Sequence, residues 1–165
     1  MDLQLQGKTA LVTGATKGIG RAIIELLSDE DCNIAFCARN EAEVASTVEA
    51  ISAKGVSVCG RVVDVMDGDA FKGFIDEAAG ELGGVNILVS NVSGGNAPGD
   101  EGWINQFNGN VLTAVHGVEA AVPHMESSGD GSIIMISTTA AVEKFMNAGP
   151  YNAMKAALIQ HAGAL

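Results

Sequence analysis

A tyrosine and a lysine near the end of the chain could work together in proton transfer. Tyr151 and Lys155 stand four residues apart, and residues at this spacing are neighbours on one face of a helix. A tyrosine hydroxyl is a weak acid at neutral pH, and an adjacent ammonium stabilises its phenolate. Such a pair could protonate an alkoxide or deprotonate an alcohol. A pair that only decorates a helix is the alternative, and the two residues alone leave both open.

A second group of residues has the spacing of a phosphate-holding turn. Residues 13–20 read Thr-Gly-Ala-Thr-Lys-Gly-Ile-Gly, between an apolar run and an amphipathic stretch. Gly14 is expected to permit the sharp turn, Gly18 to let the backbone approach the phosphates, and Gly20 to let the helix pack on the strand. The N-terminus of that helix would offer N–H groups to a pyrophosphate, although an ordinary tight turn is the alternative. The other candidate ligands in the turn are Thr16, Lys17 and Ile19.

The residues after the second predicted strand bear on which nicotinamide cofactor binds. An acidic residue there would accept from the ribose 2′-hydroxyl and repel a 2′-phosphate, but this chain has Ala38, Arg39 and Asn40. Arg39 could hold a 2′-phosphate, with Lys17 as a second cation. They predict NADP(H) over NAD(H), with solvated surface cations as the alternative. Asp64, after the third strand, could accept from the adenine amino group or cap the next helix.

The elements that must position these residues alternate between strand and helix. Strands are predicted at 9–13, 33–37, 56–63, 85–89 and 133–136, and helices at 19–30, 41–54, 69–82, 102–128 and 150–165. Asn40 is a plausible helix N-cap and Gly55 a stop, and the first helix is expected to bury Ile19, Ile23, Leu26 and Leu27. The alternation predicts one Rossmann-like, doubly wound α/β domain over 1–165, with a parallel sheet and helices on both faces.

Composition narrows the class of protein. The 165 residues are 47% hydrophobic and carry a net charge of −11, which argues against nucleic acid or an anionic membrane as a partner. No apolar stretch is long enough to span a bilayer. Cys32, Cys37 and Cys59 form no Cys-x-x-Cys pair and are expected to be small buried hydrophobes in a reducing cytoplasm. No metal site is predicted.

Several motifs together resemble the short-chain dehydrogenase/reductase family, and the ketoreductase branch that includes NADPH-dependent 3-oxoacyl-(acyl carrier protein) reductase in particular. The resemblance runs along the whole chain. It rests on the 13–20 turn, Asp64, Asn91, Asn110, the 131–138 strand and Tyr151-Asn-Ala-Met-Lys155. It implies that Tyr151 exchanges the proton, Lys155 also holds the nicotinamide ribose, and Asn110 holds a relay water. The further cofactor contacts implied are Val65 and Asn91.

The chain departs from the family pattern at two points. The family places a serine thirteen residues before the tyrosine to hold the substrate carbonyl, and Thr138 stands there. Threonine keeps the hydroxyl, so Thr138 is favoured over its neighbour Ser137, which would need a one-residue shift. The usual Asn-Asn-Ala-Gly after the fourth strand is replaced by residues 90–93, Ser-Asn-Val-Ser, which puts the contacts of Ser90 and Ser93 in doubt.

The resemblance also implies a longer fold, a partner and an activity. The family has about seven strands against five predicted here, so a C-terminally incomplete domain is expected. Family members associate through two long helices, which predicts a homo-oligomer, dimer or tetramer, through 102–128 and 150–165. The expected activity is NADP(H)-dependent hydride transfer on a small carbonyl or secondary alcohol, of 3-oxoacyl type. The alternatives are a non-catalytic dinucleotide-binding fragment and an NAD-dependent dehydrogenase of a sugar, steroid or diol.

Overall fold

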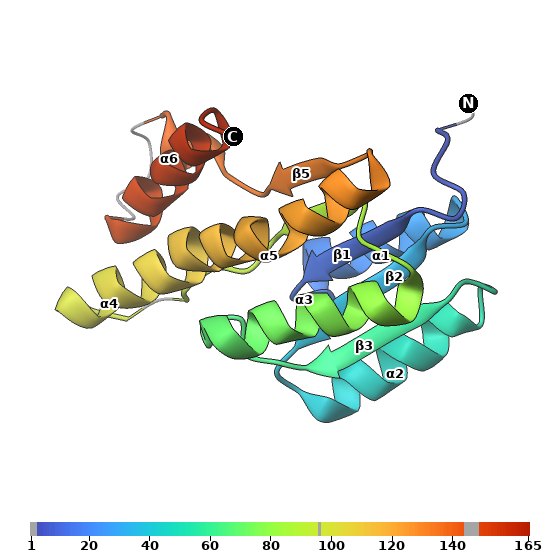
Figure 1. Ribbon diagram of the computed structural model, residues 1–165. Coiled ribbons are helices and arrows are strands. Elements are labelled where there is room, and N and C mark those ends of the chain that lie inside the picture. The colour runs from blue at the N-terminus through green and yellow to red at the C-terminus, as the bar shows by residue number, and fades with distance from the viewer. Residues whose placement is uncertain (1–2, 96, 144–148) are drawn as a thin grey trace.

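A single parallel sheet of five strands forms the centre of the protein (Figure 1). The computed structural model describes residues 3–95, 97–143 and 149–165. The strands lie in the order β3-β2-β1-β4-β5, and Leu11 of β1 stands opposite Ala35 of β2 and Leu88 of β4. The strand bounds are β1 Thr9–Thr13, β2 Asn33–Ala38, β3 Val58–Val62, β4 Ile87–Ser90 and β5 Ser132–Met135. The order reverses between β1 and β4, where a crevice opens in sheets of this kind.

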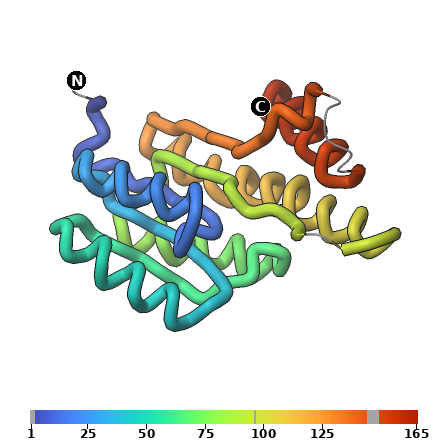
Figure 2. Tube along the Cα trace, turned by 180° about the vertical axis from the view of Figure 1, so that it is seen from behind, coloured from blue at the N-terminus to red at the C-terminus, as the bar shows by residue number. Residues whose placement is uncertain are grey.

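Helices cover both faces of the sheet, as predicted. Helices α1 and α2 lie on one face and α3 and α5 on the other, which Figures 1 and 2 show from opposite sides. The helix bounds are α1 Gly18–Asp29, α2 Glu41–Ser52, α3 Gly68–Leu82, α4 Gly99–Gln106, η1 Phe107–Leu112, α5 Thr113–Ser128, η2 Thr139–Ala141 and α6 Pro150–Ala162. No helix among the described residues is both long and apolar enough to cross a membrane.

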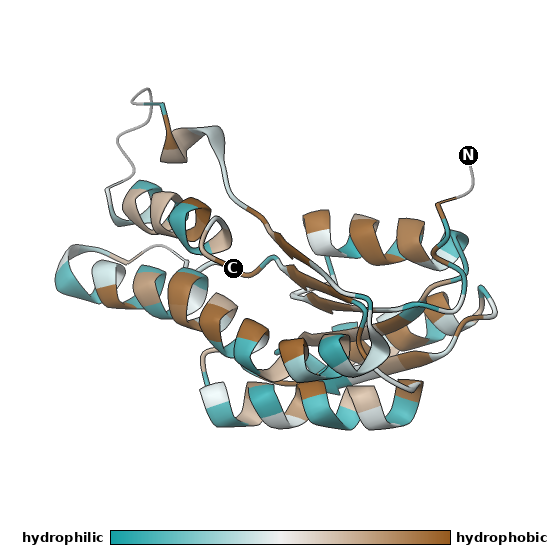
Figure 3. Ribbon diagram, turned by 45° about the horizontal axis from the view of Figure 1, so that its top comes forward, coloured by the Kyte–Doolittle hydropathy of each residue, from teal (hydrophilic) through white to brown (hydrophobic). Residues whose placement is uncertain are grey.

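Two hydrophobic clusters hold the layers together, one on each face of the sheet. Alternate residues of β1 divide between them: Leu11 packs toward α3 and α5, and Ala10 and Val12 pack toward α1 and α2. Figure 3 shows hydrophobic residues concentrated along the strands. The three cysteines are buried and free, as expected. Burial raises the pKa of the Cys37 thiol to about 12, so this thiol is protonated at neutral pH.

The predicted buried face of α1 is partly wrong. Ile19 and Leu26 are 62% and 68% exposed, and the buried positions are Gly20, Ile24 and Ser28. Small residues at 20 and 28 let the helix approach the sheet closely, which the apolar periodicity alone does not predict. The cap of α2 is confirmed, since Asn40 Oδ1 accepts from the Glu43 N–H at 3.0 Å.

The helix predicted over 102–128 is two α-helices, α4 and α5, separated by a segment of different pitch. Between α4 and α5, the six residues of η1 form a π-helix, which takes an extra residue per turn. The alternative role for Asp64 is also corrected: Asp67 caps α3, accepting from the Ala70 N–H at 3.1 Å, whereas Asp64 accepts from the Met66 N–H at 3.0 Å.

Candidate functional site

The turn after β1 is locked to the end of β4. The side-chain amide of Asn91 donates to the Thr13 carbonyl at 3.0 Å, and the Asn91 backbone N–H donates to Thr13 Oγ1 at 2.9 Å. Gly14 lies in the left-handed region at φ +65°, and a Cβ there would meet Val92 at 2.9 Å. Asn91 therefore holds the shape of the turn and does not line the neighbouring pocket.

The start of α1 is arranged to accept a phosphate group. A Cβ on Gly20 would lie 2.6 Å from the Gly14 carbonyl oxygen, so only glycine allows this approach. Gly18 has φ +58° with no atom near its missing Cβ, leaving open space over the backbone. The first turn carries no acidic residue and the N-cap, Lys17, makes no side-chain cap. The first N–H groups of α1 therefore lack a side-chain cap, as they do where a helix N-terminus binds a phosphate group.

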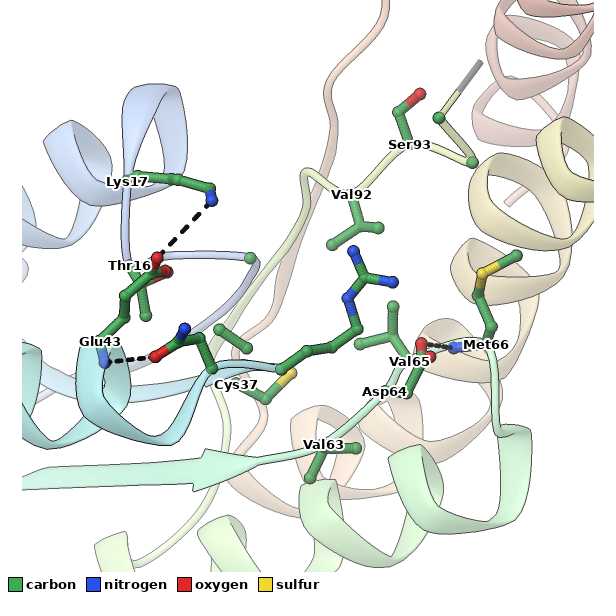
Figure 4. A pocket seen from close by; sticks show the side chains of 16 residues that line it. Thr16, Lys17, Cys37, Glu43, Val63, Asp64, Val65, Met66, Val92 and Ser93 are labelled. Atoms are coloured by element: carbon green, nitrogen blue, oxygen red, sulfur yellow. Dashed lines mark hydrogen bonds and ion pairs between the residues drawn. The ribbon is translucent and has the colours of Figure 1, made fainter. Parts of the chain in front are cut away.

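A pocket of about 330 Å³ follows the carboxyl ends of four strands (Figure 4). Segments after β1, β2, β3 and β4 all contribute to its lining. It brings together six of the predicted cofactor-binding residues: Gly14, Thr16, Lys17, Arg39, Asp64 and Val65. Of the others, Gly18, Ile19 and Gly20 form the start of α1 beside it. The pocket thus lies beside the glycine turn and is lined by both cationic and carboxylate side chains.

One charged residue of the pocket was not predicted from the sequence. Glu43, in the first turn of α2, accepts from Thr16 Oγ1 at 2.8 Å and lies 3.7 Å from Lys17 Nζ. The Asn40 cap, three residues earlier, brings its side chain to the glycine turn. A first-turn glutamate after an N-cap was visible in the sequence, but its long-range partners were not.

Tyr151 and Lys155 share one face of α6, and the lysine is deeply placed. Lys155 is 3% exposed, and its Nζ donates to the Ile136 carbonyl at 2.6 Å. The same nitrogen is 5.9 Å from the centroid of the half-buried Tyr151 ring. Burial lowers the pKa of Lys155, because the charged form loses hydration. The helix thus holds an ammonium beside a phenol.

The two hydroxyl residues after β5 have different contacts. Ser137 Oγ donates to the Lys155 backbone carbonyl at 3.1 Å and so ties α6 to the strand end. Thr138 Oγ1 accepts from the Ala140 N–H at 3.3 Å and caps η2. A hydroxyl that accepts in this way still has its own proton to donate. Ser137 therefore has a structural task, and Thr138 keeps a donor for a substrate oxygen.

Asn110 lies inside the π segment, which packs against α6. Its side-chain amide donates to the Gln106 backbone carbonyl at 2.9 Å and to Gln106 Oε1 at 2.6 Å. The buried Asn110 Oδ1 has no hydrogen-bond partner among the described residues. A buried acceptor of this kind suits a water or another donor. Gln106 was not singled out in the sequence, yet it fixes the Asn110 side chain.

A second pocket of about 340 Å³ lies beside Tyr151. Trp103, Gln106 and Pro150 contribute to its lining, and Gly95 lines both this pocket and the pocket of Figure 4. The pocket beside the predicted proton donor and the pocket of the predicted adenosine site therefore adjoin at Gly95. Within the described residues, no three His, Cys, Asp or Glu side chains gather as they would around a metal ion.

Comparison with known proteins agrees with this arrangement. Residues 8–165 match the family model for short chain dehydrogenase. The chain is 35% identical to dehydrogenase/reductase SDR family member 4 of Sus scrofa, over 94% of this chain and 58% of that protein. It superposes on the L-sorbose reductase of Gluconobacter frateurii, solved with NADPH and L-sorbose, with TM-score 0.94, 31% identity and coverage of 99% and 65%. Carveol dehydrogenase of Mycobacterium avium, solved with NAD, gives TM-score 0.91, 27% identity and coverage of 97% and 65%.

Proposed function

This chain belongs to the short-chain dehydrogenase/reductase family, and on that premise we propose that its protein is an NADP(H)-dependent oxidoreductase of carbonyls and secondary alcohols. The observation that carries the proposal is that Gly95 lines both the pocket of the glycine turn and the pocket of Tyr151. The chain spans 58% to 62% of the length of the first curated relatives it matches, so the activity is proposed for the whole protein.

In this proposal Tyr151 donates a proton to the substrate oxygen in reduction and removes it in oxidation. The ammonium of Lys155 stabilises the phenolate and holds the nicotinamide ribose, and Thr138 donates to the substrate oxygen. Asn110, with its unpartnered buried Oδ1, holds the water that resupplies the proton. A bound nicotinamide supplies or accepts the hydride.

The proposed cofactor is NADP(H), with NAD(H) as the second candidate. The lining of the pocket includes Gly14, Thr16, Lys17, Arg39, Asp64 and Val65. The proposed cofactor-binding residues also include Gly18, Ile19, Gly20, Asn91, Tyr151 and Lys155. An arginine and a lysine in one pocket favour a 2′-phosphate. Solved relatives include an NADPH complex and an NAD complex.

The proposed substrate is a small carbonyl compound, with 3-oxoacyl groups as the first class to test. We also propose a cytoplasmic homo-oligomer joined through the long helices. Four large apolar side chains on these helices are exposed by 40% or more, which supports association there. They are Trp103, Ile104, Phe107 and Ile159.

The test is NADPH consumption with a panel of ketones that includes 3-oxoacyl thioesters, cyclic ketones and keto sugars. Tyr151→Phe is expected to lower kcat by about a hundredfold or more, the range for losing a general acid. Binding of 2′,5′-ADP should stay unchanged, because Tyr151 lies outside the pocket of Figure 4. Equal rates for the two proteins would contradict the catalytic assignment. Binding without any turnover would favour the dinucleotide-binding fragment.

A further inference from the structure

The two cations that favour a 2′-phosphate share their pocket with a carboxylate. Glu43 lines the same pocket as Lys17 and Arg39. Its Oε1 lies 3.7 Å from Lys17 Nζ, and its Oε2 accepts from Thr16 Oγ1 at 2.8 Å. Figure 4 shows the Glu43 and Lys17 side chains directed toward each other. Both oxygens of this carboxylate are therefore turned toward the glycine turn.

The charges lining this pocket balance, with two cations, Lys17 and Arg39, against two carboxylates, Glu43 and Asp64. The carboxylates differ in their contacts. Asp64 accepts from the backbone N–H of Met66 at 3.0 Å and forms no ion pair with a described residue. Glu43 faces the lysine that the 2′-phosphate argument needs. Its side chain is 40% exposed, so solvent screens its charge only in part.

The position of Glu43 is well determined. Its backbone N–H donates to Asn40 Oδ1 at 3.0 Å, which fixes the first turn of α2 at the end of β2. Its side chain is then held by Thr16 from the opposite side. With its backbone fixed by Asn40 and its carboxylate held by Thr16, Glu43 keeps its charge beside the glycine turn at little further cost in side-chain entropy.

We propose that Glu43 is a specificity-determining residue, and that its charge lowers the ratio of the affinity for NADP(H) to the affinity for NAD(H). This inference rests on the proposed function, because it takes the pocket of Figure 4 as the adenosine end of the cofactor site. A 2′-phosphate must draw Lys17 away from Glu43 and bind beside a negative charge. An unphosphorylated ribose leaves the Lys17–Glu43 pair in place. The protein therefore binds both cofactors with a smaller ratio of affinities than its two cations alone would give.

The test measures binding of 2′,5′-ADP and 5′-AMP by titration calorimetry, which needs no catalysis. Glu43→Gln removes the charge and keeps both the size and an acceptor for Thr16. The ratio of the two affinities is expected to rise about tenfold in low salt and by less than about threefold in high salt, because exposed charges are screened. Glu41→Gln is the matched control, since Glu41 is an exposed first-turn glutamate of α2 outside the pocket lining.

Each outcome decides the matter. A ratio that rises in Glu43→Gln and stays constant in Glu41→Gln supports the inference. Equal changes in the affinity of both ligands would assign Glu43 a structural role only, and equal effects of the two substitutions would reflect net charge; either result overturns the inference while the cofactor site stands. A wild-type protein that binds neither ligand overturns the proposed cofactor site and the inference with it.

Discussion

The glycine turn and the Tyr151 region are supported in different ways. All five residues of β1 are buried, and the turn that follows lies between two flanking strands. The strand before Thr138 is β5, at one end of the strand order, where Ile134 is 45% exposed. Lys155 is tied to the residues after β5 by hydrogen bonds with Ile136 and Ser137. The strand that positions the binding end is therefore fully buried, whereas the catalytic end follows a partly exposed strand and is linked to it by individual hydrogen bonds.

The largest expected effect tests the packing at the binding end. Gly20→Ala places a methyl group 2.6 Å from a backbone oxygen, so we expect a loss of about 2 kcal/mol in the free energy of unfolding. Because the turn must shift, binding of 2′,5′-ADP should also weaken by about tenfold, which corresponds to about 1.4 kcal/mol of binding free energy. Urea unfolding and calorimetry measure the two effects.

Gly73→Ala is the matched control for that substitution. Gly73 is exposed in the middle of α3, and a Cβ there meets no atom within 4 Å. The same methyl group should raise the free energy of unfolding by about 0.5–1 kcal/mol, because alanine loses less backbone entropy in a helix. Losses of equal size at both positions would show that the close approach at Gly20 is not what matters.

The next effect tests the hydrogen bonds at the catalytic end. Gln106→Met keeps the side-chain volume but removes the acceptor that holds Asn110 at 2.6 Å. We expect kcat to fall about tenfold, in line with the loss of one buried hydrogen bond, with binding of 2′,5′-ADP unchanged. Gln106→Glu retains an acceptor for Asn110 but loses the donor to the Gly95 carbonyl, so it should recover only part of kcat. If both variants lose the same activity, Gln106 acts through its bond to the Gly95 carbonyl instead.

The smallest effect concerns the buried ammonium. Burial lowers the pKa of Lys155 in the folded state. At pH values below that lowered pKa, the buried lysine is charged and its full destabilising effect is present. This destabilisation disappears as pH rises from the lowered pKa to the pKa of lysine in the unfolded chain. The free energy of unfolding should therefore rise with pH, by at most about 1.4 kcal/mol per pH unit. Urea unfolding of wild type and Lys155→Met between pH 7 and about pH 10.5 gives the difference. A difference that is flat or falls with pH would contradict this sign.

The two regions also differ in how far the sequence could predict them. The bounds of β1, the Asn40 cap and the φ angles of Gly14 and Gly18 follow from local patterns. The π segment does not, because the apolar periodicity of the long helix continues through it and its hydrogen bonding depends on packing with α6. Glu43 was missed for a similar reason, since its partners are 26 and 27 positions away in the sequence.

The apolar periodicity also does not predict how closely α1 packs against the sheet. The pattern predicts that Ile19 and Leu26 face the sheet, whereas the structure buries Gly20 and Ser28. The apolar pattern predicts a buried face of large residues, although a helix that lies very close to a strand needs small ones there.

The π turn has a consequence for how this fold can diversify. By inserting an extra residue, η1 changes the angular phase between α4 and α5, so the side chains upstream of it follow a different direction from those downstream. Trp103 and Gln106 face the pocket, while Gly117 and Val118 pack in the seam with the sheet and α3. The two parts of this helical run therefore face different surroundings, the pocket upstream and the core downstream. A substitution at the exposed Trp103 can change the lining of the pocket without replacing a residue of the core cluster.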